Sequence, residues 1–448
     1  MSTSAATKPS GIPWLGEVPA HWEAKRLKYL ASTNDEALSE TANPTQEIVY
    51  VEIGGVDAVE GIVAKEQLVL EDAPSRARRL VRHGDTIVST VRTYLRAIAP
   101  IRDPEPNLIV STGFAVIRPR ELEPDYLGYA LRSPYFIETI VSRSTGVSYP
   151  GINASEIGNI EVAYPPPPEQ RAIAAFLDER TARIDGLIAR KQRLVQLLKE
   201  KRQALITRAV TRGLDANVNL KESGVPWLGE VPEHWEVKPL GYLVTMRGGC
   251  TPSRSDPGFW DGEIPWASPK DIKIDHLTDT EEHVTDEALT GSGLELIRDR
   301  SLLLVVRGMI LAKRVPTSIM EVPMTINQDM KALLPIEGAV LIDYLKLIFD
   351  GLQGPFSSVI EEAGHGTKAL RTDLIRALKL PIPHIDEQRD IVSRVQSGTA
   401  RIDALVTKVE QAVLRLQEYR TALISAAVTG KVRVPNGRSA DQKIRQRS

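Results

Sequence analysis

Basic side chains that gather with tyrosine, serine and glutamine are the residues of this chain whose types and spacing point most directly to chemistry. Guanidinium and ammonium groups bind phosphate oxygens, and guanidinium, amide and hydroxyl groups read base edges. These residues form one set in each half of the sequence, and we rank the run at 92–96 highest. The sets are Arg76, Arg78, Arg92, Tyr94, Arg96, Ser148 and Tyr149, and then Arg247, Arg254, Lys270, Arg307, Lys313, Arg314, Gln328, Lys368 and Arg371. They predict two nucleic-acid-binding surfaces, although a solvated surface charge is the alternative for any single member.

The motifs of several reactive sites are absent from the sequence. It has no P-loop, no Cys-x-x-Cys pair, no His-Glu-x-x-His motif and no Gly-x-Ser-x-Gly elbow. The usual adenine-methyltransferase motifs are absent too, and the seven histidines show no metal-ligand spacing. His21 and His234 lie beside Trp22 and Trp235, which favours structural packing for both. We therefore expect a protein that recognises rather than reacts, with no catalytic residue and no metal.

An internal repeat supplies the elements that must position the basic sets. The stretch GIPWLGEVPAHWEAKRLKYL at 11–30 recurs as GVPWLGEVPEHWEVKPLGYL at 224–243. Further on, YPPPPEQRAI at 164–173 matches IPHIDEQRDI at 382–391. The long stretches between these blocks show little resemblance to each other. Each half therefore consists of a shared opening, a variable module, a proline hinge and a shared long helix, which makes a pseudo-symmetric pair rather than a solenoid.

Two long helices are predicted, at 166–213 and 383–432. Steps of four and three residues from Ile391 give a nearly continuous apolar seam, and the same register from Ile173 gives a seam with three basic positions. Such seams favour an antiparallel coiled coil between the helices. The alternative is two helices that pack separately on their own modules. The seam residues assigned to the coiled coil or to a partner are Ile184, Leu187, Leu194, Leu198, Ile402, Leu405, Val409 and Leu416.

The predicted fold class is α+β, with two mixed α/β modules joined by the two helices in a pseudo-two-fold repeat. The modules are expected at 11–165 and 224–382, and a flexible tail at 433–448. Runs rich in β-branched residues at 47–53, 85–91 and 114–119 predict strands in the first module. In the second module, Thr372 is a candidate helix cap.

Composition restricts the class of protein only broadly. The formal net charge is −2 and the sequence pI is about 6.4, which argues against a non-specific nucleic-acid coat. Cys250 is the one cysteine, so a disulfide framework is excluded. No apolar run approaches the roughly 18 residues of a membrane span, and the first residues lack the order of a signal peptide. We expect a cytoplasmic protein.

The repeated frame resembles the specificity subunits of type I restriction–modification enzymes. The resemblance rests on two variable modules, two shared helices entered through Glu169-Gln170-Arg171 and through Glu387-Gln388-Arg389, an Ala-Arg-Ile-Asp run in each helix, and the twin Trp-Leu-Gly-x-Val-Pro-x-His-Trp openings. It covers essentially residues 11–435.

The resemblance implies that each module is a target-recognition domain for one half of a split, asymmetric site in double-stranded DNA. It implies a paired-helix ruler, two docked methyltransferase subunits and restriction/translocase subunits. Those partners would carry S-adenosylmethionine, ATP and Mg²⁺, so this chain would bind no cofactor, and a partner would flip the adenine. Two other readings stay open: an adaptor that organises proteins without DNA, and a self-sufficient modification enzyme.

Overall fold

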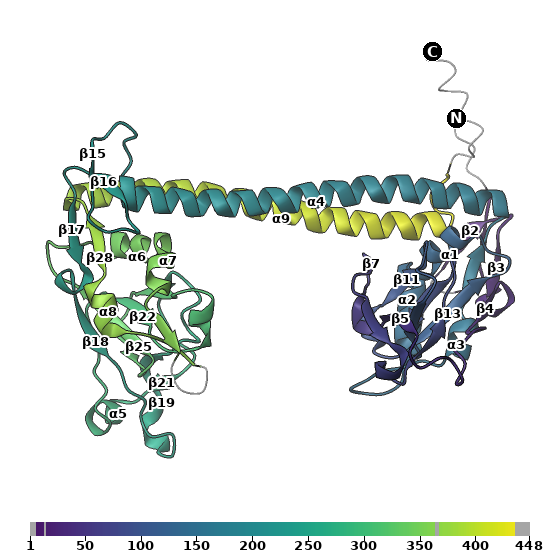
Figure 1. Cartoon of the computed structure of the whole chain (residues 1–448), viewed down its shortest axis with the longest axis horizontal. Coiled ribbons are helices and arrows are strands. Elements are labelled where there is room, and N and C mark those ends of the chain that lie inside the picture. Colours follow the sequence, from purple (N-terminus) through teal and green to yellow (C-terminus); the bar gives the residue numbers. More distant parts are fainter. Residues whose placement is uncertain (1–5, 13–14, 363–366, 435–448) are drawn as a thin grey trace, which may run out of the picture. The chain divides into compact units, whose positions relative to one another are not determined.

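The structure is a computed structural model, and it describes residues 6–12, 15–362 and 367–434. It divides into two compact units, Met1–Lys191 with Gln411–Ser448, and Gln192–Glu410. Each unit combines one module with a segment of both long helices (Figure 1). Among the helices of the described ranges, none has the length and apolar character that a membrane crossing requires.

The first unit contains two four-stranded sheets, and its 3₁₀ turns are labelled η. Its elements are β1 (Thr7–Pro9), β2 (Glu17–Pro19), β3 (Glu23–Arg26), η1 (Leu27–Tyr29), β4 (Ala31–Thr33), β5 (Glu47–Val51), η2 (Ile53–Gly55), β6 (Val56–Asp57), β7 (Gly61–Ile62), β8 (Glu66–Val69), η3 (Leu70–Asp72), β9 (Ala77–Leu80), β10 (Thr86–Ser89), η4 (Thr93–Leu95), β11 (Ile98–Pro100), β12 (Leu108–Ser111), β13 (Phe114–Pro119), α1 (Pro124–Leu131), α2 (Pro134–Arg143), α3 (Ala154–Gly158), β14 (Glu161–Tyr164) and the first part of α4 (Pro167–Arg212).

The strand β10 shows how the first module builds its core. Its sheet has the order β11-β10-β13-β4, and the second sheet has the order β8-β5-β12-β9. Successive side chains of a strand point to opposite faces. Val88 therefore packs into the cluster that contains α1 and α2, whereas Ile87 packs into the cluster between the two sheets. Burial on both faces makes β10 a fixed support for the turn that follows it.

The second unit repeats the first sheet. Its elements are the rest of α4, β15 (Leu220–Glu222), β16 (Glu230–Pro232), β17 (Glu236–Pro239), η5 (Leu240–Tyr242), β18 (Val244–Gly248), η6 (Pro257–Phe259), β19 (Trp260–Ala267), β20 (His276–Leu277), β21 (His283–Val284), α5 (Asp286–Gly291), β22 (Leu302–Val305), η7 (Met309–Ala312), β23 (Thr317–Met320), β24 (Thr325–Ile326), β25 (Met330–Pro335), α6 (Ile342–Gly351), α7 (Gln353–Ser357), β26 (Ile360–Glu362), β27 (Lys368–Leu370), α8 (Thr372–Ala377), β28 (Lys379–Ile382) and the first part of α9 (Ile385–Val428). The rest of α9, from Gln411, belongs to the first unit.

The two modules share a sheet order that their sequences do not reveal. The five-stranded sheet of the second module has the order β18-β25-β22-β23-β20. Its first four strands repeat the order β4-β13-β10-β11 of the first module. The pairs β3–β14 and β17–β28 also correspond, as do β1–β2 and β15–β16. The stretches that differ in sequence therefore contain a common scaffold. The modules diverge in what is added to it: the sheet with β5 and β12 in one, and β19, β21 and α5 in the other.

The repeated opening docks onto the long helix that follows it in each unit. The indole N–H of Trp22 donates to Glu169 Oε2 at 2.8 Å, and His21 Nε2 lies 2.7 Å from Glu169 Oε1. In the second unit, Trp235 donates to one oxygen of the glutamate at 387 and His234 contacts the other, at 3.0 and 2.8 Å. The histidines therefore have a structural role, as expected.

The glutamine beside each of these glutamates fastens the same helix to its module. Gln170 is fully buried; its Oε1 accepts from the Glu123 N–H at 2.8 Å and its Nε2 donates to the Pro165 carbonyl at 2.8 Å. Gln388 repeats both bonds, at 2.8 and 3.0 Å, with the residue that precedes α6 and with the hinge proline. A buried amide with both ends paired avoids a desolvation penalty of about 1–3 kcal/mol. The glutamate and the glutamine of the shared Glu-Gln-Arg motif thus form a structural lock in each unit.

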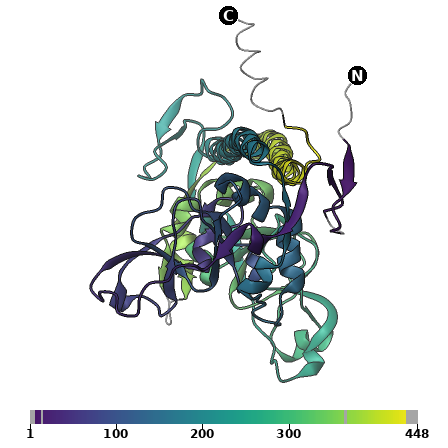
Figure 2. The ribbon, with the colours of Figure 1, turned by 90° about the vertical axis from the view of Figure 1, so that its right-hand side faces the viewer.

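The long helices lie side by side in each unit (Figures 1 and 2), and their contacts show that they run antiparallel. In the first unit, Arg420 of α9 donates to Asp185 of α4 at 2.9 Å. In the second, Arg202 of α4 donates to Asp403 of α9 at 3.0 Å. A side chain at position 398 would lie 2.8 Å from a methyl group of α4, so the glycine there permits close approach of the two helices.

The predicted seam is wrong at alternate positions. Leu187, Leu194 and Leu405 are exposed, whereas Val195 is 9% exposed and Val406 is partly buried. The assigned seam residues that do lie inward are Ile184 and Ile402, which are buried, and Leu198, Val409 and Leu416, which are partly buried. The inward-facing positions of α4 are 184, 188, 191, 195 and 198. Their spacing from residue 184 alternates four and three residues, whereas the predicted spacing alternated three and four. Adjacent apolar residues such as 187–188 and 194–195 fit both orders, and the sequence could not choose between them.

Other boundaries differ slightly from the prediction. The helix expected at 166–213 is Pro167–Arg212, and the helix expected at 383–432 is Ile385–Val428. The cap assigned to Thr372 is wrong: Arg371 has the extended backbone of the cap, and Thr372 is already the first helical residue. All but the first two residues of the predicted tail at 433–448 lie outside the described residues.

Candidate nucleic-acid interface

In the first unit, a strained turn presents the highest-ranked residues. The turn η4 follows β10, and Arg92 and Arg96 flank it with left-handed backbones, at φ 52° and φ 54°. Such a backbone costs a non-glycine residue about 1–3 kcal/mol and persists only where its surroundings enforce it. Thr93 supplies part of that restraint, because it is buried and its hydroxyl donates to Ser144 at 2.8 Å. The turn therefore points Arg92 and Tyr94 outward at the end of a rigid strand.

A second loop, residues 144–153, is joined to this turn. Val91 and Gly151 form an isolated antiparallel bridge, and the Ile152 N–H donates to the carbonyl of residue 90 at 2.8 Å. A side chain at position 151 would lie 3.1 Å from that carbonyl, which favours glycine there. The Arg92 guanidinium lies 5.2 Å from the ring centroid of Tyr149, and that tyrosine is 67% exposed. The structure thus brings the predicted residues of the two loops onto one surface.

The remaining predicted residues of the first unit have different surroundings. Arg96 donates to Glu138 at 2.7 Å, so its charge is shared with α2. Ser148 is exposed on the 144–153 loop. Arg76 is exposed, and its carbonyl accepts from the Thr112 N–H at 2.8 Å. Arg78 lies half-buried in β9, which places it among the strand residues rather than on the two loops.

The second unit builds a surface with the same backbone plan. The turn η7 follows β22, and Gly308, at φ 142°, holds the position that corresponds to Arg92. Arg307 forms an isolated bridge with Ala369, and the Gly308 N–H donates to the Lys368 carbonyl at 2.9 Å. The segment after β22 is therefore hydrogen-bonded to the segment just before α8. In the first unit, the segment after β10 is bonded in the same way to the loop just before α3. This match between units was not visible in the sequence.

The residues around η7 add exposed cations and one amide. Lys313 and Arg314 are exposed where the turn ends. The next loop also supports the site, because the Asp329 carbonyl accepts from the Arg307 N–H at 3.3 Å. Gln328, in that loop, is exposed and accepts a hydrogen bond from the Thr251 hydroxyl.

Three other predicted cations of the second unit are paired with carboxylates. Lys368 donates to the acid at position 362 at 2.9 Å, and Arg247 lies 3.5 Å from the acid at 295. Arg371 binds Asp373 through two bonds, of 2.9 and 2.5 Å. Its guanidinium lowers the pKa of that carboxyl to about 2. For these residues a DNA-binding role stays a prediction, since each ion pair would have to open.

Arg254 and Lys270 belong to the part of the second module that has no counterpart in the first. Arg254 stacks 3.9 Å from the Trp260 ring centroid and hydrogen-bonds Glu282. That bond holds the pKa of the Glu282 carboxyl below its usual value. Lys270 is exposed in the turn after β19. The contacts of Arg254 are those of a structural residue, and its predicted role in DNA binding is untested.

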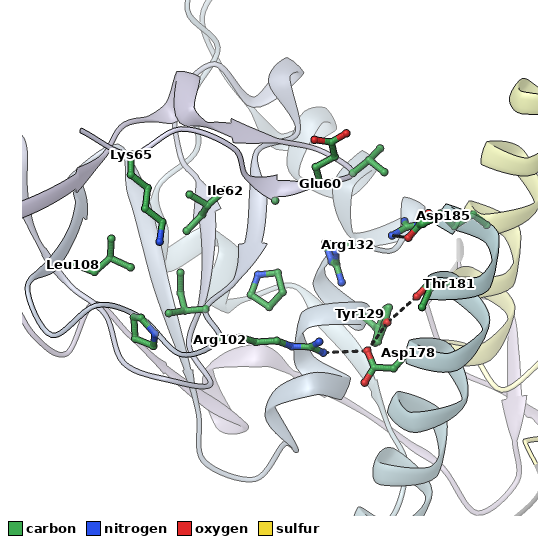
Figure 3. A pocket seen from close by; sticks show the side chains of 17 residues that line it. Glu60, Ile62, Lys65, Arg102, Leu108, Tyr129, Arg132, Asp178, Thr181 and Asp185 are labelled. Carbon is green, nitrogen blue, oxygen red and sulfur yellow. Dashed lines mark hydrogen bonds and ion pairs between the residues drawn. The ribbon is translucent and has the colours of Figure 1, made fainter. Parts of the chain in front are cut away.

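A groove of about 760 Å³ opens between the first module and the long helices (Figure 3). Arg102 and the Tyr129 hydroxyl both donate to Asp178 of α4, at 3.1 and 2.8 Å. Arg132 donates to the Gly128 carbonyl at 3.0 Å, and burial lowers its pKa. None of the sequence-predicted site residues lines the groove, so we interpret it as part of the junction between module and helix.

The structure adds residues that the sequence analysis missed. Met309 is 66% exposed on η7, and Val147 is fully exposed on the 144–153 loop. Thr93 and Gly151 fix the geometry without being exposed cations. A search for charged residues could not find them, although an apolar residue between glycine and serine, as at 146–148, is a usable signal of a loop tip. Within the described ranges, no three His, Cys, Asp or Glu side chains gather as a metal site.

Comparison with known proteins gives this geometry a family. The type I restriction modification DNA specificity domain matches residues 19–196 and again residues 232–415. The specificity subunit of the type I restriction enzyme EcoR124I/EcoR124II from Escherichia coli is 31% identical over 207 residues. That match covers 46% of this chain and 48% of the relative, so the chain spans about half the length of that protein.

Two further likenesses extend over more of the chain. The specificity subunit of the type I restriction enzyme MjaVIII from Methanocaldococcus jannaschii is 23% identical over 323 residues, which cover 69% of this chain and 71% of the relative. A solved chain from a study of complex assembly and conformational transition in a type I R-M system has a TM-score of 0.76 at 23% identity. It covers 93% of this chain and 99% of its own length, which shows a common fold. Because the domain matches once in each half and covers well over half of the residues, the chain belongs to the family of type I restriction–modification DNA specificity domains.

Proposed function

We propose that this chain reads a split, asymmetric DNA site, with one half-site for each unit. Family membership gives it the role of specificity subunit rather than of catalyst. The observation that carries the proposal is the pair of fastened loops, η4 with 144–153 and η7 with the strand β27, on the same backbone plan in both units. A common scaffold that presents cations and hydrogen-bonding groups from short loops suits base-edge reading.

The side chains at equivalent places of the two loop pairs differ. Val91 in the first unit corresponds to Arg307 in the second, and Arg92 corresponds to Gly308. Two surfaces with the same backbone plan and different side chains are suited to reading different bases. This supports an asymmetric target rather than a palindrome.

The same proposal includes the partners. Two methyltransferase subunits and the restriction/translocase subunits would bind the repeated frame, in the cytoplasm. S-adenosylmethionine, ATP and Mg²⁺ would be bound by those subunits, and this chain would hold none of them. The duplicated frame supports two copies of one partner, because it offers the same structural lock twice.

The test is DNA binding by the chain together with its methyltransferase subunit. Arg92→Ala should weaken specific binding by about 1–3 kcal/mol, or roughly 5- to 150-fold, and relax the choice of base in one half-site. The matched control is Arg120→Ala, which removes an exposed arginine of the same unit that lies outside both loops. If Arg92→Ala left affinity and base choice unchanged, this surface would not be the reader. Failure of the complex to shift duplex DNA would instead favour the protein adaptor.

A further inference from the structure

Two tyrosines of the repeated opening have no place in either core. Tyr29 ends η1 and Tyr242 ends η5, and they are 66% and 74% exposed. In contrast, the leucines on either side of each tyrosine are buried, as Leu27 and Leu30 show in the first unit. The opening thus keeps an exposed aromatic ring at the same position in both units, where packing inside the chain does not require one.

Two positions shortly before each tyrosine, exposed in the first unit and partly exposed in the second, differ between the two units. Arg26 corresponds to Pro239, and Lys28 corresponds to Gly241. Positions that only face solvent are free to change in this way. Retention of an exposed tyrosine directly after a position that has changed indicates a function outside the fold of each unit.

A basic side chain packs at the 3₁₀ turn that ends in the tyrosine in both units, although a different element supplies it. In the first unit, Lys28 on η1 packs over Gly158 of α3, with its ammonium 5.4 Å from the Tyr29 ring centroid. In the second unit the pair is reversed: Gly241 lies on η5, and Arg376 of α8 packs over it. The cation is supplied by η1 in the first unit and by α8 in the second, and in both it lies at the turn that carries the tyrosine. This exchange favours a common surface with a common requirement.

An acid–base pair lies on the strand that precedes each tyrosine turn. Glu23 lies 2.7 Å from Lys25 on β3, and Glu236 pairs with Lys238 on β17. A retained carboxylate would repel a DNA phosphate but is compatible with a protein surface of mixed charge. Tyrosine is also a frequent anchor of protein interfaces, because its ring is large and its hydroxyl can stay hydrated.

We infer that Tyr29 and Tyr242 are the anchors of two equivalent docking surfaces, each of which takes one copy of the same protein partner. The inference rests on the proposed function, and it assigns the methyltransferase subunit as that partner. The partner surface must offer a recess for the ring and an acidic group for Lys28 or Arg376. Each of the two tyrosine surfaces then accounts for one bound copy.

The experiment counts bound methyltransferase subunits by native mass spectrometry and measures their affinity by sedimentation velocity. The full chain should bind two copies. Tyr29→Ala and Tyr242→Ala should each leave one tight copy and weaken the other about tenfold or more, and the double variant should weaken both. Lys28→Glu and Arg376→Glu should reproduce the single losses by reversing one charge, which provides a second route if an alanine variant folds poorly.

Tyr149→Ala is the matched control, because it removes an equally exposed tyrosine from the DNA-reading loop and should leave two copies bound. If the double tyrosine variant still bound two copies at the original affinity, the docking surface would be refuted while the proposed function stood. If it kept both copies and lost DNA affinity, the surface would belong to DNA instead. If the unaltered chain bound no methyltransferase subunit, the proposed function would fail along with this inference.

Discussion

Replacing Glu169 with alanine tests whether the repeated opening is a structural lock. The substitution removes the acceptor of the Trp22 indole N–H, and Trp22 is only 3% exposed. A buried donor left without a partner costs about 1–3 kcal/mol. The contact with the half-exposed His21 contributes up to about 1 kcal/mol. We therefore expect the first unit to lose about 1–4 kcal/mol of unfolding free energy.

The assay is equilibrium urea unfolding followed by far-ultraviolet circular dichroism. With a urea dependence of about 2–3 kcal/mol per molar, the midpoint of the first unit should fall by roughly 1 M. Glu169→Gln keeps an acceptor for the indole and should lose about half as much. Arg171→Ala is the matched control, since it changes an exposed neighbour on the same helix. A midpoint for Glu169→Ala that coincides with the Arg171→Ala control would refute the lock.

The remaining predictions concern the long helices and one ion pair. Val195→Ala should cost about 1–2.5 kcal/mol of unfolding free energy and Leu194→Ala less than about 0.5; urea midpoints in the opposite order would restore the seam predicted from the sequence. Gly430→Ala should destabilise by more than about 1 kcal/mol, because its φ is +73° and the new methyl group would overlap Pro19. Gly186→Ala, inside α4 and with open space around it, should be neutral or stabilising by up to about 1 kcal/mol. Equal melting temperatures for the Gly430→Ala and Gly186→Ala variants would contradict this reasoning. Hydrogen bonding by Arg300 lowers the pKa of Glu321 from 4.5 to about 2. Glu321→Gln should therefore cost about 1–2 kcal/mol at neutral pH, and that difference from the unaltered chain should shrink as pH falls from about 4.5 to about 2; a difference independent of pH would show that the ion pair does not stabilise the fold.

The repeat made the overall organisation of the chain predictable. Positions such as Trp22 and Trp235 appear at matching places, and the Glu-Gln-Arg motif marks the start of each long helix. Two helices and two mixed modules follow from that pattern alone. The sheet order common to both modules could not be read, because a strand records which of its faces is buried and not which strand lies beside it.

The sequence predicted which residue types belong to the candidate site, but not how they are arranged in space. Sequence patterns placed Arg92 and Tyr149 in one set, and the structure brings them within stacking distance through the Val91 bridge. They could not show that Arg96 would pair with Glu138, since that acid lies on a helix 42 residues away. Counting cations therefore overestimates the free charge of a surface, because long-range carboxylates neutralise some of its members.

The most direct test of the account is a genome-wide map of adenine methylation in the host, made with the unaltered gene, without it, and with one reading loop changed at a time. The account predicts one split motif that disappears with the gene. Arg92→Ala should relax only one half-site of that motif, and Arg307→Ala should relax only the other. A methylation pattern indifferent to the gene, or two variants that alter the same half-site, would contradict the claim that each unit reads its own half.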